Sequence, residues 1–144
     1  MRLKLLIAAT LFTLTSAVGV QPVAGATAQK ITWSVIGDCV DEYDANQYEY
    51  LMYEGDECYF KVQVKPAFPA RKVALQWFSD DRGKWLTENE KMTNKNGVAF
   101  LYPDAYDSDG YFYDGEYKYR MAAARAAGQA IRTSDSFYIT FMGE

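Results

Sequence analysis

The clearest β pattern of the chain lies in residues 58–78, which read CYFKVQVKPAFPARKVALQWF. Apolar residues alternate with polar or amphipathic ones through 58–64, and the same period of two returns in 71–78. Because successive side chains of a strand point to opposite faces of a sheet, each half predicts a strand with one apolar face. Pro66 and Pro69 end the first strand, since proline has no amide hydrogen to donate to its neighbours.

Similar alternation on both sides of this pair predicts further strands. They are 31–37, 84–91, 97–103, 116–125 and 136–142. We also predict an edge strand at 48–53, and an acidic excursion loop at 38–50. Seven strands at spacings of about ten residues, with turn signals between them, are typical of a β-sandwich. We therefore expect an all-β fold, which the many Tyr and Phe residues also favour.

Two of these segments carry finer predictions. Residues 122–127 fit a strand or a helix, and we favour the strand because alternating residues precede them and Gly128 would end a helix early. The strand at 84–91 is predicted to be short and polar, with Trp85 as its anchor. The dipeptide Asn96-Gly97 then predicts a hairpin turn.

Residues 1–26 predict a cleavable signal peptide. A basic start is followed by an apolar run through 5–20 and then by the small residues VAGA. This order is that of a secretory signal, with cleavage after Ala26 or, as second choice, after Ala28. An uncleaved membrane anchor is the alternative, but the apolar run is short for a bilayer. We therefore expect one secreted, extracellular domain, residues 27–144.

The charge of the chain narrows the choice of partners. Its 144 residues include 19 acidic and 15 basic ones, and removal of the signal with Arg2 and Lys4 leaves a formal charge of −6. Nucleic acids and anionic membranes attract clustered Lys and Arg, so we expect neither as a partner of the mature chain. The charge suits a soluble monomer, or a cationic partner.

Cys39 and Cys58 are the only cysteines in the sequence. An oxidising compartment favours a disulfide between them over two free thiols. Closing a loop of this length would stabilise the fold by roughly 3 kcal/mol in the chain-entropy model. We expect the bridge to tie the acidic segment to the body of the domain.

Five segments of the second half share a pattern of core positions and turns. They are RKVALQWF at 71–78, GKW at 83–85, TNKNG at 93–97, DGEYKYR at 114–120 and SDSFYITF at 134–141. Together they resemble bacterial immunoglobulin-like and fibronectin-type-III-like modules of exported proteins. The resemblance implies an immunoglobulin-like sandwich of about seven strands and says little about function.

The same resemblance bears on the two cysteines and on two tyrosines. Both cysteines precede Trp77, unlike the cysteine pair of antibody domains, so antibody-like recognition loops are not implied. Tyr117 is placed like a tyrosine-corner residue, whose hydroxyl would bond to backbone a few residues upstream. Ordinary core packing of Tyr117 and Tyr119 is the alternative.

The chain contains no histidine. This excludes Ser-His-Asp and Cys-His catalysis and histidine-containing zinc sites. A glycosidase with paired carboxylates is the remaining enzymatic alternative, but such enzymes generally need a larger scaffold with a deep cleft. We expect no catalytic residues, no enzymatic activity and no required cofactor.

Calcium is the one metal that the sequence suggests, in the loop 104–115. An EF-hand is not expected, because Ala105 occupies the first ligand position and the flanking residues predict strands. A looser oxygen cage of Asp104, Asp107 and Asp109 could hold calcium between strands. The alternative, which we favour, is that these residues end strands and form turns.

Tyrosines and acidic residues gather in two loops and suggest a binding surface. Its candidate residues are Tyr43, Tyr48, Tyr50, Tyr53, Tyr106, Tyr111 and Tyr113. Tyrosine offers a rigid contact area with a polar tip, which suits protein or glycan ligands, although these rings could equally cover the ends of the sandwich. We therefore expect a secreted, non-catalytic binding or accessory module. The alternative is a structural or inhibitor-like secreted protein, stabilised by calcium.

Overall fold

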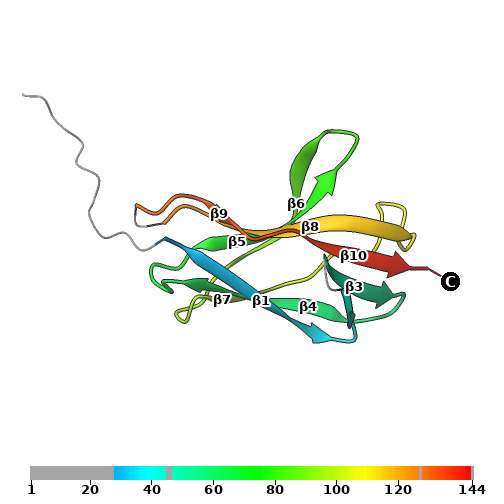
Figure 1. The fold of residues 1–144 in the computed structure, drawn as a ribbon, viewed down its shortest axis with the longest axis horizontal. Coiled ribbons are helices and arrows are strands. Elements are labelled where there is room, and N and C mark those ends of the chain that lie inside the picture. Colours follow the sequence, from blue (N-terminus) through cyan, green and yellow to red (C-terminus); the bar gives the residue numbers. More distant parts are fainter. Residues whose placement is uncertain (1–27, 45–46, 127, 144) are drawn as a thin grey trace, which may run out of the picture.

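The computed structural model describes residues 28–44, 47–126 and 128–143, and the predicted signal peptide lies outside these ranges. Figure 1 shows two β-sheets that face each other, and no helix occurs in the described ranges. The prediction of an all-β fold is confirmed. Two facing sheets that share one core are compatible with a β-sandwich.

The smaller sheet has three strands in the order β1 (Lys30–Gly37), β4 (Cys58–Lys65) and β7 (Val98–Leu101). The larger sheet has seven strands. Its main path runs β2 (Val40–Asp44), β3 (Gln47–Tyr53), β10 (Phe137–Met142), β8 (Gly115–Ala123), β5 (Lys72–Ser79) and β6 (Lys84–Met92), and β9 (Arg132–Thr133) pairs with β8. Neighbours pair antiparallel, except that β10 runs parallel to β3.

The core fills the space between the sheets, as the alternation of the sequence predicts. Phe60 of β4 and Phe137 of β10 are fully buried, and their ring centroids lie 5.3 Å apart across the two layers. Every second residue of both strands joins them. These residues are Val62, Val64, Ile139 and Phe141. Each such side chain stabilises the fold by about 1.5 to 3 kcal/mol relative to exposure.

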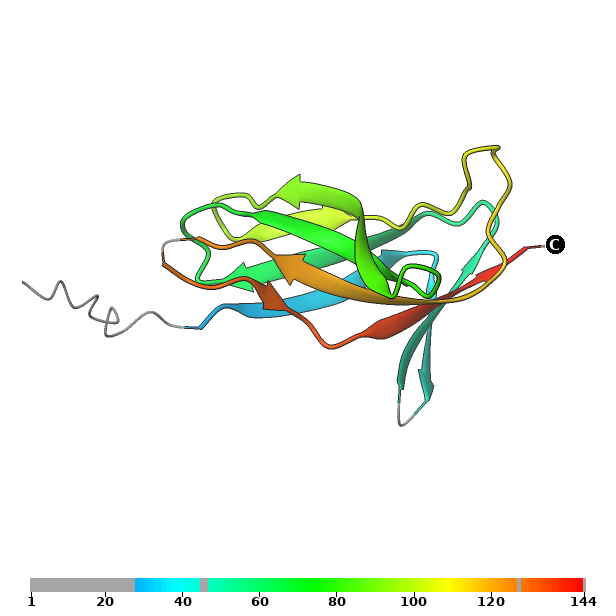
Figure 2. The same cartoon turned by 90° about the horizontal axis from the view of Figure 1, so that it is seen from above.

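The prediction of an excursion loop at 38–50 is wrong. Residues 40–44 and 47–53 form the antiparallel pair β2–β3, which projects from the molecule in Figure 2. The prediction of an edge strand at 48–53 is also wrong in its position, because β3 lies between β2 and β10. Interior strands bury one face, and Met52 is buried accordingly. A turn at 54–56 follows β3, with the Asp56 amide donating to the Tyr53 carbonyl at 3.1 Å.

The Asn96-Gly97 turn exists, but it does not close a hairpin within one sheet. It leads from β6 in the larger sheet to β7 in the smaller one. Asn94 organises the turn, because its side-chain oxygen accepts the amides of Asn96 and Val98 at 2.9 and 3.0 Å. Gly97 has a φ of 75°, and a Cβ there would lie 2.3 Å from the Val64 carbonyl oxygen.

The structure also tests two predictions about single strands, β6 and β8. The strand predicted as short at 84–91 is long, since β6 covers Lys84–Met92. The choice of strand over helix for the segment before Gly128 is confirmed up to the end of β8 at Ala123.

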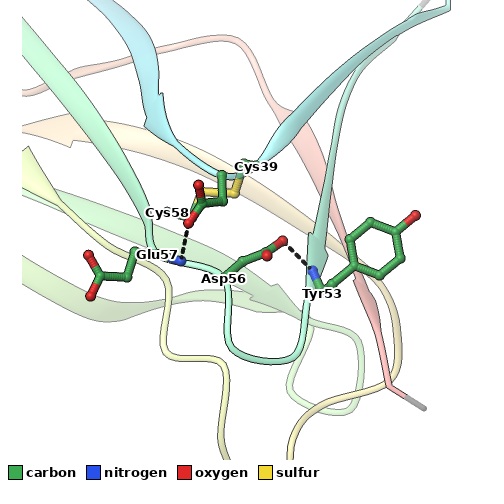
Figure 3. The surroundings of a disulfide bond; sticks show 6 residues. Cys39, Tyr53, Asp56, Glu57 and Cys58 are labelled. Carbon is green, nitrogen blue, oxygen red and sulfur yellow. Dashed lines mark hydrogen bonds between the residues drawn. A yellow bond between two sulfur atoms is a disulfide. The ribbon is translucent and has the colours of Figure 1, made fainter.

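The predicted disulfide between Cys39 and Cys58 is confirmed (Figure 3). It joins the segment after β1 to the first residue of β4, where Gly37 and Cys58 already face each other in the ladder. The Cα atoms of the two cysteines are 5.4 Å apart. Nearby, the Asp56 carboxylate accepts the Tyr53 amide at 2.8 Å and so fixes the turn between β3 and β4. The bridge thereby anchors the β2–β3 pair at its base.

Candidate functional site

A groove opens where the neighbouring strands β5 and β8 separate. Their pairing runs from Val73 opposite Ala123 to Trp77 opposite Tyr119. Beyond this last pair, the end of β5 and the start of β8 line the two sides of a groove of about 680 Å³. The groove therefore results from the divergence of two strands that are held together firmly in the core.

Acidic side chains dominate the rim of this groove. Asp80 and Asp81 come from the turn after β5, where the Gly83 amide donates to the Asp80 carbonyl at 3.2 Å. Glu116 comes from β8 on the other side, and Lys118 is the one basic residue among the lining residues. All three carboxylates are exposed, so the groove presents a negative field to ligands.

A smaller cavity of about 60 Å³ adjoins the groove on the core side, and both share Trp77, Tyr113 and Tyr117 as lining residues. Tyr119 and Glu88 complete the small cavity, which we call the Glu88 pocket. A cavity that holds one water needs roughly 10 to 15 Å³. The Glu88 pocket therefore has room for a small organic group.

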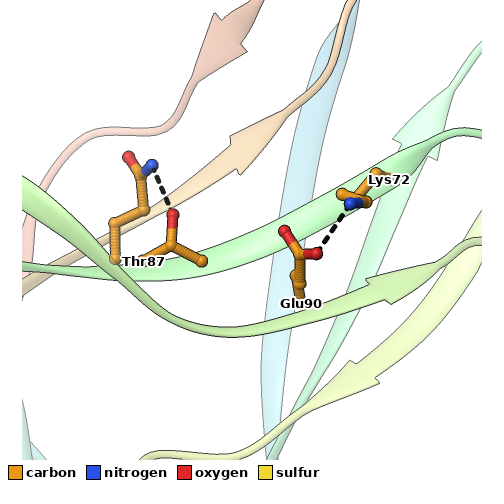
Figure 4. A network of polar contacts seen from close by, with 4 residues as sticks. Lys72, Thr87 and Glu90 are labelled. Atoms are coloured by element: carbon orange, nitrogen blue, oxygen red, sulfur yellow. Dashed lines mark hydrogen bonds and ion pairs between the residues drawn. The ribbon is translucent and has the colours of Figure 1, made fainter.

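A β-bulge places Glu88 in this pocket. In the pairing of β5 with β6, Gln76 faces Thr87 while its neighbour Leu75 faces Asn89, so Glu88 has no partner in the register. Figure 4 shows the residue pair next to the bulge, in which the Gln76 amide donates to the Thr87 hydroxyl at 3.2 Å. Bulges re-aim a side chain and often lie beside functional sites.

The Glu88 carboxyl is buried with only one of its oxygens bonded. The Tyr119 hydroxyl donates to Oε1 at 3.1 Å, while Oε2 is buried without a hydrogen-bond partner. Burial raises the pKa of Glu88 to about 7, and the Tyr119 bond and the nearby Asp104 backbone offset part of that rise. The Asp104 backbone is close enough to favour the ionised form, but it does not reach Oε2 with ordinary hydrogen-bond geometry.

The tyrosines of the pocket are held in place by other rings. Burial raises the pKa of Tyr119 far above its usual value, and the adjacent Glu88 carboxylate adds to the rise. The Tyr119 ring stacks near Phe137 with centroids 6.2 Å apart, and Tyr117 contacts Phe141 at 5.7 Å. Tyr113 in turn lies 5.7 Å from Tyr117. These contacts fix the aromatic walls in place before any ligand enters.

Comparison with protein-family models, curated proteins and solved structures finds no match to the chain. The site is therefore interpreted from its own chemistry.

Only some of the tyrosines predicted to form a binding surface are exposed in the structure. Tyr50 is 5% exposed and packs edge-on against Phe60 and Phe137, so its prediction as a binding residue is wrong. The side chains of Tyr43 and Tyr48 lie outside the described part of the chain. Exposed rings remain at Tyr53, Tyr106 and Tyr111, and Tyr113 lines the Glu88 pocket.

The two tyrosine-bearing segments approach each other at the end of β3, where Met52 and Tyr106 line a common groove, but their tips point apart. In Figure 2 the β2–β3 pair and the loop 104–114 project from opposite sides of the molecule. The loop has its own order, with a bridge between Tyr106 and Phe112, whose rings contact at 5.4 Å.

The predicted calcium cage does not form. No group of three or more acidic residues or cysteines that could hold a metal ion comes together in the described ranges. Instead, Asp107 Oδ1 accepts the amides of Asp109 and Tyr111, both at 2.9 Å, and Asp104 Oδ1 accepts the Tyr106 amide at 3.4 Å. The aspartates therefore build the turns of this loop, as the alternative interpretation stated.

Tyr117 both packs in the core and makes a tyrosine-corner hydrogen bond, the two alternatives that the sequence left open. Its ring packs in the core against Phe141, and its hydroxyl reaches the Asp114 carbonyl, three residues upstream, at 3.5 Å. The sequence did not predict it as part of a site, nor did it point to Trp77 or Glu88. In the polar strand TENEK, residue 88 gives no signal that its side chain turns inward.

Proposed function

We propose that this chain is a secreted, non-catalytic binding module on an immunoglobulin-like β-sandwich, and that it binds a cationic group of a protein partner in the Glu88 pocket. One observation carries the proposal: a buried carboxyl in an aromatic-walled cavity has an oxygen, Glu88 Oε2, with no partner in the protein. A buried acceptor without a partner costs about 1 to 3 kcal/mol, and a ligand that donates to it recovers this free energy.

The walls and the rim favour a cation over other ligands. Ammonium groups are attracted to the faces of Trp and Tyr rings, and a carboxylate in the same cavity adds direct charge pairing. The acidic rim of Asp80, Asp81 and Glu116 would attract a basic segment and guide its side chain inward. A lysine side chain of a partner protein, free or methylated, has the charge and the shape that this arrangement accepts.

Secretion rests on the predicted signal peptide and is supported by the Cys39–Cys58 disulfide, which suits an oxidising compartment. In the described residues, no helix is long and apolar enough to cross a membrane. The immunoglobulin-like assignment rests on the resemblance of residues 71–141 and is supported by two facing sheets with a shared core.

The test is an NMR titration of the purified protein with Nα-acetyl-trimethyllysine amide, which carries a permanent cation. The control ligand is a neutral analogue in which a carbon replaces the charged nitrogen. We expect the Trp77 indole signal to move only with the cation, and Glu88→Gln to weaken binding at least tenfold, because a charged partner is lost.

A matched variant separates pocket effects from general ones. Phe100→Ala removes an exposed ring from the smaller sheet, outside the pocket, and should leave binding unchanged. Equal affinity for the neutral analogue, or full binding by Glu88→Gln, would contradict recognition of a cation by this carboxyl.

A further inference from the structure

The end of the molecule opposite the acidic groove exposes two large apolar side chains on adjacent loops. Phe68 lies in the loop between β4 and β5 and is 84% exposed, and Ile131 lies just before β9 and is 65% exposed. Both loops lie at the same end in Figures 1 and 2, together with the start of β1. We call this end the apolar tip, defined by Phe68 and Ile131.

The loops that carry the tip contain no acidic residue. Residues 65–72 read KPAFPARK and residues 122–132 read AAARAAGQAIR, so apart from one Gly and one Gln every residue is apolar, small or basic. Lys65, Arg125 and Arg132 are exposed there. Loops in water are normally polar and of mixed charge, and this composition instead suits a boundary between apolar and anionic material.

Further basic residues surround the tip. Lys30 at the start of β1 and Lys95 in the turn before β7 are exposed at the same end, and this turn touches the first loop, where Gly97 lies against Ala67. Among the described residues the one ion pair is Lys72 of β5 with Glu90 of the edge strand β6, 2.6 Å apart (Figure 4). Lys72, which ends the first loop, is therefore neutralised, whereas the exposed Lys65, Arg125 and Arg132 have no ion-pair partner among the described residues.

A buried arginine fixes the two loops to each other. Arg71 is 3% exposed and donates to the carbonyls of Pro66 and Pro69, at 2.7 and 3.2 Å, within the first loop. The same guanidinium donates to the side chain of Gln129 in the second loop at 2.9 Å. Gln29 joins them, since its Oε1 accepts from Arg71 at 2.8 Å. Phe68 and Ile131 are therefore presented by a braced scaffold.

The charges of the molecule are separated along its length. Asp80, Asp81 and Glu116 place negative charge at the groove, away from the two loops of the tip. The expectation of no anionic-membrane partner rests on the net charge of the mature chain and on the need for clustered Lys and Arg, without regard to where the charges lie. Surface attraction acts within a Debye length, about 8 to 10 Å, so a basic tip responds to a nearby anionic surface despite distant acids.

We propose that the apolar tip docks on an anionic phospholipid membrane, with Phe68 and Ile131 entering the boundary between headgroups and acyl chains and the surrounding lysines and arginines contacting phosphates. Exposed apolar groups and the basic residues around them together supply the two signals that reversible membrane attachment requires. The acidic groove then faces away from the membrane, where the proposed cationic partner would reach it.

The test is sedimentation of the purified protein with vesicles of phosphatidylcholine, alone or mixed with phosphatidylglycerol. We expect binding only to the mixed vesicles, with at least a tenfold loss in Phe68→Ser combined with Ile131→Ser. The matched control, Phe100→Ser combined with Tyr111→Ser, removes exposed rings elsewhere and should bind like the unchanged protein. Phe68→Trp should shift its emission to the blue on binding and be quenched by brominated lipids.

Three results would overturn the proposal. Absence of binding to mixed vesicles at low salt is the first. Binding that falls with salt but is insensitive to the Phe68 and Ile131 changes, and that soluble polyphosphate displaces fully, would indicate an anion site without insertion. A dimer in sedimentation velocity that the same two changes dissociate would assign the tip to contact between copies of this chain.

Discussion

Replacing Glu88 by glutamine should stabilise the protein in a strongly pH-dependent way. The carboxyl has a pKa of 4.5 when free and about 7 in the folded protein, because burial penalises its charge. Between these values the folded state binds more protons than the unfolded state, so stability from this group is present below pH 4.5 and is lost as the pH rises to 7. At 1.36 kcal/mol per pH unit, the full loss is about 3 kcal/mol.

The amide of Glu88→Gln has no charge to bury, so this loss disappears in the variant. Its oxygen can still accept the Tyr119 hydroxyl, and its nitrogen occupies the place of an oxygen that already has no partner. We expect the variant's advantage in free energy of unfolding to grow by about 2 to 3 kcal/mol between pH 5 and pH 8.

Urea unfolding at the two pH values measures this difference as a shift of the midpoint by about 1 to 2 M. Glu116→Gln is the matched control, since it removes an exposed carboxylate from the same groove and should change little with pH. If the gain from Glu88→Gln is the same at pH 5 and pH 8, the carboxyl is solvated and the reasoning is refuted.

The remaining predictions concern binding, the disulfide, a turn and the tip. Affinity for a permanent cation should rise about tenfold from pH 6 to pH 8 as the pocket carboxyl ionises, and a flat titration curve would contradict the pairing. Cys39→Ser with Cys58→Ser should lower the free energy of unfolding by about 3 kcal/mol, checked against the reduced unchanged protein. Gly97→Ala should cost well over 1 kcal/mol in urea unfolding because of its positive φ and the backbone oxygen beside it, whereas Gly110→Ala, with a similar φ and open space around it, should cost less. Arg71→Met should cost about 3 kcal/mol, because buried carbonyl groups lose their donor, and thermal unfolding that is unchanged would contradict the role of the guanidinium.

Local pattern was enough to predict the strands that bury one face against the core. In β4 and β10 every second residue is apolar, and residues such as Phe60 and Phe137 are buried as expected. The β2–β3 pair was not predicted from local pattern, because its acidic and aromatic residues do not alternate cleanly. Its position depends on parallel pairing with β10, in which Tyr50 lies opposite Ile139, almost ninety residues away. A periodicity within one segment carries no information about such a partner.

The candidate site was predicted less well, for a related reason. Tyr113 was anticipated, but Glu88 enters the pocket through a bulge, and a one-residue slip between strands leaves no trace in composition. The Asn96-Gly97 signal likewise specified a tight turn without specifying which sheet receives the chain next. Aspartates of the loop 104–115 had the right chemistry for a metal, but their oxygens are used by backbone amides.

The central place of β10 has a consequence for how the chain matures. The larger sheet is completed by a strand near the carboxyl end, which joins β3 on one side and β8 on the other. Until residues 137–142 have left the ribosome, β3 has no neighbour on that side, and the buried rings of Phe137 and Phe141 are missing from the core. Contacts over such sequence distances form slowly and late. We therefore expect the larger sheet to assemble only after β10 has been synthesised.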